Sequence, residues 1–163
     1  MPTIINGTTG IDLIQDGAVK QADLASNVVG NGPCFRAELA AATVFAANGV
    51  NLVLTNVIHN IGGHYSATTG RFQPTVAGFY FTDAYMNLES GSFTRALLTI
   101  NISSGVGGFR AADSVGSVVF LGGSGLVYLN GTTDFLSFNA FLTGTNLMLQ
   151  TSTRISAFLV RSA

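Results

Sequence analysis

The sequence predicts an all-β domain of the sandwich or jelly-roll class in residues 34–163. Short runs rich in Val, Ile, Phe, Tyr and Thr recur along this region, and Gly and Asn turn signals separate them. Side chains alternate between two faces in runs such as Phe79, Tyr80 and Phe81. No convincing helical pattern of about ten or more residues follows Pro33. About eight to ten short strands at this spacing are typical of a sandwich or jelly roll.

The expected strands follow from these runs in chain order. They are residues 34–40, 52–59, 64–65 with 71–76, 78–88, 94–103, 126–129 with 118–121 as a candidate preceding strand, 135–142, 146–150 and 155–161. The Gly-containing dipeptides at 48–49, 62–63, 69–70, 90–91 and 130–131 predict turns between these strands, and so does Gly144. The Gly- and Ser-rich stretch 104–125 is expected to be an insertion between two strands, with its glycine clusters in loops.

The chain divides near Pro33 into an attachment or linker segment, residues 1–33, and a globular domain, residues 34–163. Residues 1–33 contain no aromatic residue, whereas residues 34–163 contain every Phe and Tyr. A core needs such side chains, so the core is expected to begin near Cys34. Residues 18–25 are compatible with two helical turns, which are too short to be stable alone.

Composition excludes several function classes. A net charge of −1 gives no field that attracts nucleic acid or an anionic membrane. No run of about 18 apolar residues is present, so we expect no membrane insertion. One cysteine cannot form a disulfide framework or a cysteine-based zinc site within one chain. The N-terminus has no secretory signal pattern, so the chain is expected to be made and kept in a cytoplasm.

The low charge also favours self-association. Charged residues make up 9% of the chain, where about 25% is usual. A monomer of this mass exposes about 7,700 Å², which leaves roughly 500 Å² for each charged side chain. Such a surface resists association poorly, so we expect much of it to be buried against copies of the chain. The alternative is a monomer coated by Ser, Thr, Asn and Gly.

Candidate catalytic chemistry is sparse. The titratable groups after Pro33 are Glu38, Asp83, Glu89, Asp113, Asp134, His59 and His64. Their spacing favours no carboxylate pair of the kind that hydrolyses glycosides, so we expect no enzyme. His59 and His64 can bind a metal when three copies surround an axis, although ordinary strand-end histidines are more common. The metal site is therefore left open, and no other cofactor is expected.

Four motifs resemble the C1q/TNF-like domain in their order along the chain. They are HYSATTGRFQPTVAGFYFT at 64–82, VIHN at 57–60, LVYLNGTTD at 126–134 and TRISAFLV at 153–160. In the last motif, Ala157 stands where the family usually has Gly, and Ile155 where it usually has Phe. The resemblance covers residues 34–163. It implies a jelly roll of about ten antiparallel strands that assembles as a homotrimer.

The N-terminal part resembles a second group of proteins. GIDLIQDGAVKQADLA at 10–25 and GNGPCF at 30–35 are similar to segments that join C1q-like tips to bacteriophage tail fibres. This resemblance implies a virion protein that is made in the host cytoplasm. We expect a trimeric tail fibre tip that binds a host surface glycan or protein, with residues 1–33 joining it to other virion or tail proteins. The alternative is a trimeric capsid decoration, head fibre or tail-hub protein without receptor binding.

The resemblance also places candidate site residues. If the strands alternate in direction from the entry of the chain, one set of loops lies at the distal end, and its polar side chains are candidate receptor contacts. They are Asn87, Glu89, Ser92, Asn130, Thr132, Asp134 and Gln150. For any one of them, a solvated turn is the plainer interpretation. Aromatic residues of the inner sheet are expected to form the trimer interface. They are Tyr80, Tyr85, Phe138 and Phe158.

Overall fold

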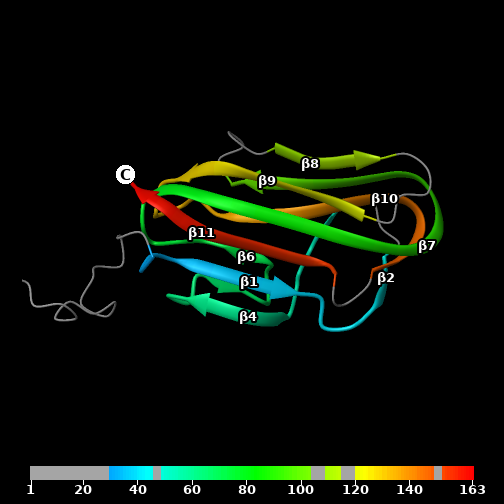
Figure 1. The fold of residues 1–163 in the computed structure, drawn as a ribbon, viewed down its shortest axis with the longest axis horizontal. Coiled ribbons are helices and arrows are strands. Elements are labelled where there is room, and N and C mark those ends of the chain that lie inside the picture. The colour runs from blue at the N-terminus through cyan, green and yellow to red at the C-terminus, as the bar shows by residue number, and fades with distance from the viewer. Residues whose placement is uncertain (1–29, 46–48, 104–108, 115–119, 149–151) are drawn as a thin grey trace, which may run out of the picture.

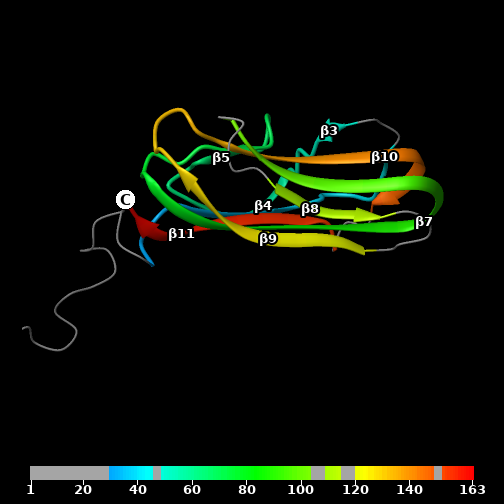
Figure 2. The ribbon, with the colours of Figure 1, turned by 90° about the horizontal axis from the view of Figure 1, so that it is seen from above.

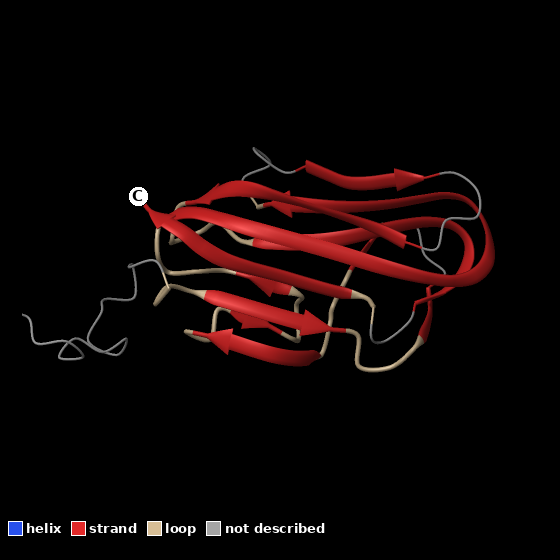
Figure 3. Cartoon of the chain, viewed as in Figure 1, coloured by secondary structure: helices blue, strands red, loops and turns tan. Residues whose placement is uncertain are grey.

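The part of the chain described by a computed structural model consists of strands and loops, with no helix (Figures 1 and 3). The structure describes residues 30–45, 49–103, 109–114, 120–148 and 152–163. Its strands are β1 (Cys34–Glu38), β2 (Thr43–Phe45), β3 (Val50–Asn51), β4 (Asn56–Ile61), β5 (Tyr65–Ser66), β6 (Arg71–Phe72), β7 (Gly78–Ile102), β8 (Phe109–Ser114), β9 (Phe120–Leu129), β10 (Leu136–Met148) and β11 (Arg154–Ser162). Accordingly, no described helix can span a membrane.

Two sheets pack against each other, and β7 takes part in both. The first half of β7 pairs with β11 and β9, and β1 and β4 extend this first sheet beyond β11. The second half pairs with β10 and β8, while β6, β3 and β2 pair in turn along the other edge of β10. Figure 2 shows the two layers from the side, with β9 and β11 in one and β10 in the other. The predicted all-β jelly-roll sandwich is thus confirmed, with antiparallel pairing throughout.

The core lies between the two sheets and is built from alternate residues of each strand. Phe35 of β1 stacks on Tyr65 and Phe72, with ring centroids 4.5 and 4.7 Å away. Phe138 of β10 meets the same ring of Phe35 edge-on at 6.3 Å. All four side chains are at most 4% exposed. This aromatic cluster joins the first sheet to the second, because β1 belongs to one and β6 and β10 to the other.

The Gly- and Ser-rich stretch differs from its prediction. It contains β8 and the beginning of β9, so the described part of residues 104–125 is not an insertion in loop conformation. Gly122, Gly123 and Gly125 pair with Tyr85, Ala84 and Thr82 of β7. A Cβ atom on Gly122 would lie 2.9 Å from Cδ2 of Tyr85, so the glycine leaves room for that ring. Gly105 to Gly108 lie outside the described residues.

Two other predicted breaks are also wrong. Residues 78–88 and 94–103 form the single strand β7, which bends between the sheets at the right of Figure 1. Residues 135–142 and 146–150 correspond largely to one strand, β10, which pairs with β7 from Leu136 to Met148. Gly91 and Gly144 predicted turns, but β7 continues through Gly91. The pairing of β10 with β7 shifts register near Gly144 and then continues.

Tyr65 offers a test of the polar contacts inside this core. Its hydroxyl donates to the carbonyl oxygen of Leu54 at 2.9 Å and accepts from the N–H of Leu54 at 3.2 Å. Replacing Tyr65 by Phe keeps the stacked ring but leaves both backbone groups of the buried Leu54 without these partners. We expect the free energy of unfolding to fall by about 1–3 kcal/mol. Urea unfolding followed by circular dichroism measures it, and an unchanged midpoint would contradict the assigned contacts.

Candidate functional site

The outer side of the first sheet carries a band of exposed and half-buried apolar side chains, which we call the aromatic face. Its members come from the first half of β7, from β9 and from β11. They are Phe79, Phe81, Tyr85, Phe120, Leu126, Tyr128, Phe158 and Val160. Phe120 and Leu126 are 55% and 57% exposed, and Phe158 is 48% exposed. Large apolar side chains gathered in this way on one face mark an interaction surface.

Ring contacts make the aromatic face continuous across three strands. Phe79 meets Tyr128 of β9 edge-on, with ring centroids 5.5 Å apart, because the two residues are paired directly. Phe81 meets Phe158 of β11 at the same distance. Tyr85 stacks on Phe120 at 5.9 Å, and the Arg154 guanidinium lies 5.0 Å from the Tyr85 ring. Arg154 also lies 3.9 Å from Asp83, and the Arg36–Glu38 pair lies beside it on β1 of the same sheet.

Two predicted interface residues are placed elsewhere. Tyr80 and Phe138 are both 0% exposed within a single chain, because they point into the space between the sheets. The Tyr80 hydroxyl donates to the carbonyl oxygen of Val76 at 2.7 Å, and burial raises its pKa. Neither side chain has surface to offer a second chain, so this prediction is wrong for both residues.

The other two predicted interface residues, Tyr85 and Phe158, lie on the aromatic face. Their role in an interface stays a prediction. The other members of the face were not predicted from the sequence. They are Phe79, Phe81, Phe120, Leu126, Tyr128 and Val160. Their alternation was visible as a period of two, but the phase that points outward is set by packing between the sheets and is not readable from one strand alone.

The turn from Asn130 to Asp134 lies at the wrong end of the molecule for the predicted contact role. Leu129, which precedes it, pairs with Gly78, and Gly78 also pairs with Ser162 near the C-terminus. The carbonyl oxygen of Pro33 accepts from the N–H of Leu159 at the same end. We call this the terminal end. The distal placement of this turn is therefore wrong, since β9 runs toward the entry of the chain.

Hydrogen bonds show what two of the turn residues do. The side-chain oxygen of Asn130 accepts from the N–H groups of Thr132, Thr133 and Asp134 at 2.9–3.0 Å. Asp134 is 8% exposed, and its carboxylate accepts from the Asn130 N–H at 3.1 Å. Asn130 and Asp134 thus hold the turn together. The buried Asp134 is not available as a receptor contact, which corrects that prediction, whereas Thr132 is exposed.

The described contact candidates that remain lie toward the opposite end, where β7 bends. Asn87 is only 4% exposed, so it cannot contact a receptor and its prediction is wrong. Glu89 and Ser92 lie within β7 opposite Leu147 and Thr145, on a paired strand rather than in a loop. Gln150 lies outside the described residues. Contact by Glu89, Ser92 and Gln150 stays a prediction.

The histidines and the cysteine lie at different places in the described part of the chain. Among the residues that the structure describes, no group of three potential metal ligands is present. His59 is exposed on β4 and His64 is half-buried after the following turn, where burial lowers the pKa of its imidazole. Burial raises the pKa of the half-buried Cys34 thiol, which therefore stays protonated at neutral pH. An ion shared by three chains is a separate expectation that a single chain does not test.

Comparison with known proteins identifies the family. The C1q domain model matches residues 34–130, more than half of the chain, and the chain belongs to this family. Similar solved structures include the globular domain of zebrafish complement 1qA, with 15% identity, a TM-score of 0.60, and coverage of 80% of this chain and 99% of that one.

Two more structures share the fold. A crystal structure of murine APRIL at pH 8.0 has 10% identity and a TM-score of 0.59 over 78% of this chain and 98% of that one. Eiger TNF from S. frugiperda has 10% identity and a TM-score of 0.56 over 80% and 92%. No curated protein matches the chain. At these identities the structural likeness shows a C1q/TNF-like fold, and C1q/TNF-like domains are often trimeric.

Proposed function

We propose that three copies of this chain assemble through the aromatic face, and that the trimer is a receptor-binding tip on a bacteriophage tail fibre or a related tail-like particle. The aromatic face is the observation that carries the assembly. A single chain leaves Leu126, Tyr128 and Phe158 between 45% and 57% exposed on one sheet. Burying such side chains against a partner is favourable by about 25 cal/mol for each Å² of apolar surface.

Copies of the chain are the partner that best fits this face. The face is rich in aromatic side chains and poor in charge, as the centre of a subunit interface is. Only 9% of the residues in the whole chain are charged, which also favours self-association. Membership of the C1q family supports a closed ring of three, because domains of this fold are often trimeric. A ring of this kind buries the face of every copy and leaves none open to form fibres.

The virion context rests on residues 1–33. Residues 10–25 resemble attachment segments of phage tail fibres, and they precede a domain whose first described strand starts at Cys34. We infer that residues 1–33 join other virion or tail proteins at the terminal end of the domain. The end where β7 bends, with Glu89 and Ser92, then points outward toward a host glycan or protein, and Gln150 stays a candidate contact. Three copies give such contacts the gain of multivalent binding.

This proposal places the protein in the virion, after synthesis in the host cytoplasm, and gives it no catalytic role. C1q/TNF-like domains are generally binding or structural modules, which supports a non-enzymatic function. No cofactor is needed for it. The proposal also allows an ion on the three-fold axis. Measuring the assembly in the presence of a chelator tests whether such an ion contributes.

Binding to cells tests the receptor role. Labelled full-length protein is expected to bind susceptible strains in a panel of bacteria and to reduce infection by the phage that carries it. Phe158→Asp, which we expect to be monomeric, should bind at least about a hundredfold more weakly because multivalency is lost. Protein that binds no strain but is incorporated into particles would contradict the tip and favour the capsid decoration or tail-hub alternative. Release of reducing sugar would contradict the non-enzymatic function.

A further inference from the structure

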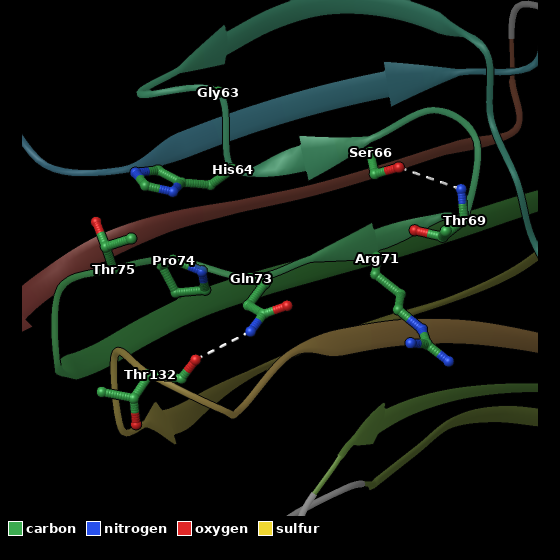
Figure 4. Close-up of a pocket in the computed structure, with 9 residues that line it drawn as sticks. All are labelled: Gly63, His64, Ser66, Thr69, Arg71, Gln73, Pro74, Thr75 and Thr132. Atoms are coloured by element: carbon green, nitrogen blue, oxygen red, sulfur yellow. Dashed lines mark hydrogen bonds between the residues drawn. The ribbon is translucent and has the colours of Figure 1, made fainter.

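A cleft of about 400 Å³ lies near the terminal end and is formed largely by the second sheet (Figure 4). Strands β5 and β6, their flanking turns and the β9–β10 turn contribute its walls, so we call it the β6 cleft. The side chains used below are those of His64, Ser66, Thr69, Arg71, Gln73 and Thr132. None of them belongs to the aromatic face, which lies on the outer side of the other sheet.

Hydrogen bonds within the chain fix the walls of the β6 cleft. The N–H of Gln73 donates to the carbonyl oxygen of His64 at 2.8 Å, and the Gln73 side-chain amide donates to the carbonyl oxygen of Thr132 at 2.9 Å. The N–H of Thr69 donates to the hydroxyl oxygen of Ser66 at 3.3 Å. Figure 4 shows the last two contacts: the Gln73 amide reaches the β9–β10 turn, and Ser66 and Thr69 meet within the turn that joins β5 to β6. The cleft is therefore formed before any ligand arrives, which reduces the ordering cost of binding.

Arg71 gives this cleft its charge. Its guanidinium carbon lies 4.2 Å from the centre of the Phe135 ring, which supports one face of the group and leaves its N–H edge for hydrogen bonding. Arg36 bonds Glu38 and Arg154 faces Asp83, but among the described residues no carboxylate lies within ion-pair distance of Arg71. No acidic side chain lines the cleft either.

The other lining side chains named above are polar and neutral, and Pro74 adds an apolar surface to the wall. Burial lowers the pKa of His64, so its imidazole is uncharged at pH 7. The remaining side chains named above supply hydroxyl and amide groups, which both donate and accept hydrogen bonds. One fixed cation beside several such groups matches a ligand with one negative charge and several hydroxyls. A phosphate dianion would meet only one cation here.

We propose that the β6 cleft binds a saccharide that carries a carboxylate, such as a uronic or sialic acid. The N–H edge of Arg71 binds the carboxylate in a forked pair of hydrogen bonds. Ser66, Thr69 and Gln73 bind the sugar hydroxyls. The inference deepens the proposed receptor-binding role, on which it rests, by naming an acidic glycan as ligand and a second site on the side of the domain.

Nuclear magnetic resonance titration of the full-length protein tests this inference. The probes are the methyl glycosides of glucuronic, galacturonic and N-acetylneuraminic acid, each compared with its neutral methyl ester. We expect at least one acid to shift the amide signals of Gly63, His64 and Gln73, and its ester to bind at least about tenfold more weakly. Arg71→Gln should weaken binding of the acidic saccharide by about tenfold to a hundredfold. Arg71→Lys should keep only part of the wild-type affinity.

Arg161→Gln is the matched control, because it removes an equal charge from an exposed position on β11. It should leave the affinity unchanged, and the amide spectra of all variants should show the same fold. The inference is overturned if no acid shifts these signals at millimolar concentration, if acid and ester bind equally, or if acetate or inorganic phosphate binds as well as the saccharides. If the protein still binds cells after such a result, the proposed receptor role is supported and only the acidic saccharide is excluded as its ligand.

Discussion

Phe158→Asp is expected to convert the proposed trimer into monomers without unfolding the domain. Phe158 is 48% exposed in a single chain and touches Phe81 near the middle of the aromatic face. In the trimer, an aspartate there would be buried among aromatic rings, where a charge without a partner is strongly unfavourable. We expect the assembly to weaken by at least about a hundredfold, the effect of losing a central interface residue. Sedimentation velocity across a concentration series measures the shift.

Val44→Asp is the matched control for this prediction. Val44 is a 63% exposed apolar side chain on β2, a strand of the other sheet. Adding the same charge there should leave both the trimer and the melting temperature unchanged. A Phe158→Asp protein that remains trimeric, or an equal loss of assembly in both variants, would contradict the assignment of the aromatic face.

Phe35→Ala is expected to give the largest loss of stability among single substitutions in the described core. The ring is 1% exposed and stacks on both Tyr65 and Phe72. Its removal leaves a cavity where β1 meets the second sheet, with an expected cost of about 3–5 kcal/mol in the free energy of unfolding. Denaturant unfolding of wild type and variant, each at several protein concentrations, separates this loss from any change in assembly.

Val53→Ala is the control for the core substitution. Val53 is 38% exposed and lies outside the aromatic face, so its truncation should change the stability of the folded chain by much less. A loss under about 1 kcal/mol for Phe35→Ala would show that the aromatic cluster does not join the sheets as described.

The fold class was predictable because it depends on features that are local in the sequence. Alternation in residues 78–88 and the turn signal at Gly62 and Gly63 mark strands and their ends wherever they pack. The signature at 64–82 added the family, and the C1q domain match includes it. β9 was harder to predict, because Gly122 and Gly123 are poor strand formers that become paired only where β7 lies beside them.

The candidate site was less predictable, because it depends on which face of each strand points outward. Tyr80 and Phe81 are adjacent and equally aromatic, yet one lies in the core and the other on the aromatic face. Shifting the phase by one residue exchanges them. The Asn130 turn was likewise placed at the wrong end. The end at which a turn lies depends on how many strands precede it, because the strands alternate in direction. β8 was not predicted from the sequence, so the number of strands was wrong.

The native mass of the full-length protein tests the central claim most directly. Light scattering after size exclusion should give three times the 16.9 kDa of one chain, both at low and at high micromolar concentration. The same measurement with a chelator shows whether an ion contributes to the assembly. A mass of 16.9 kDa throughout that range would contradict the trimer, and with it the multivalent receptor-binding tip.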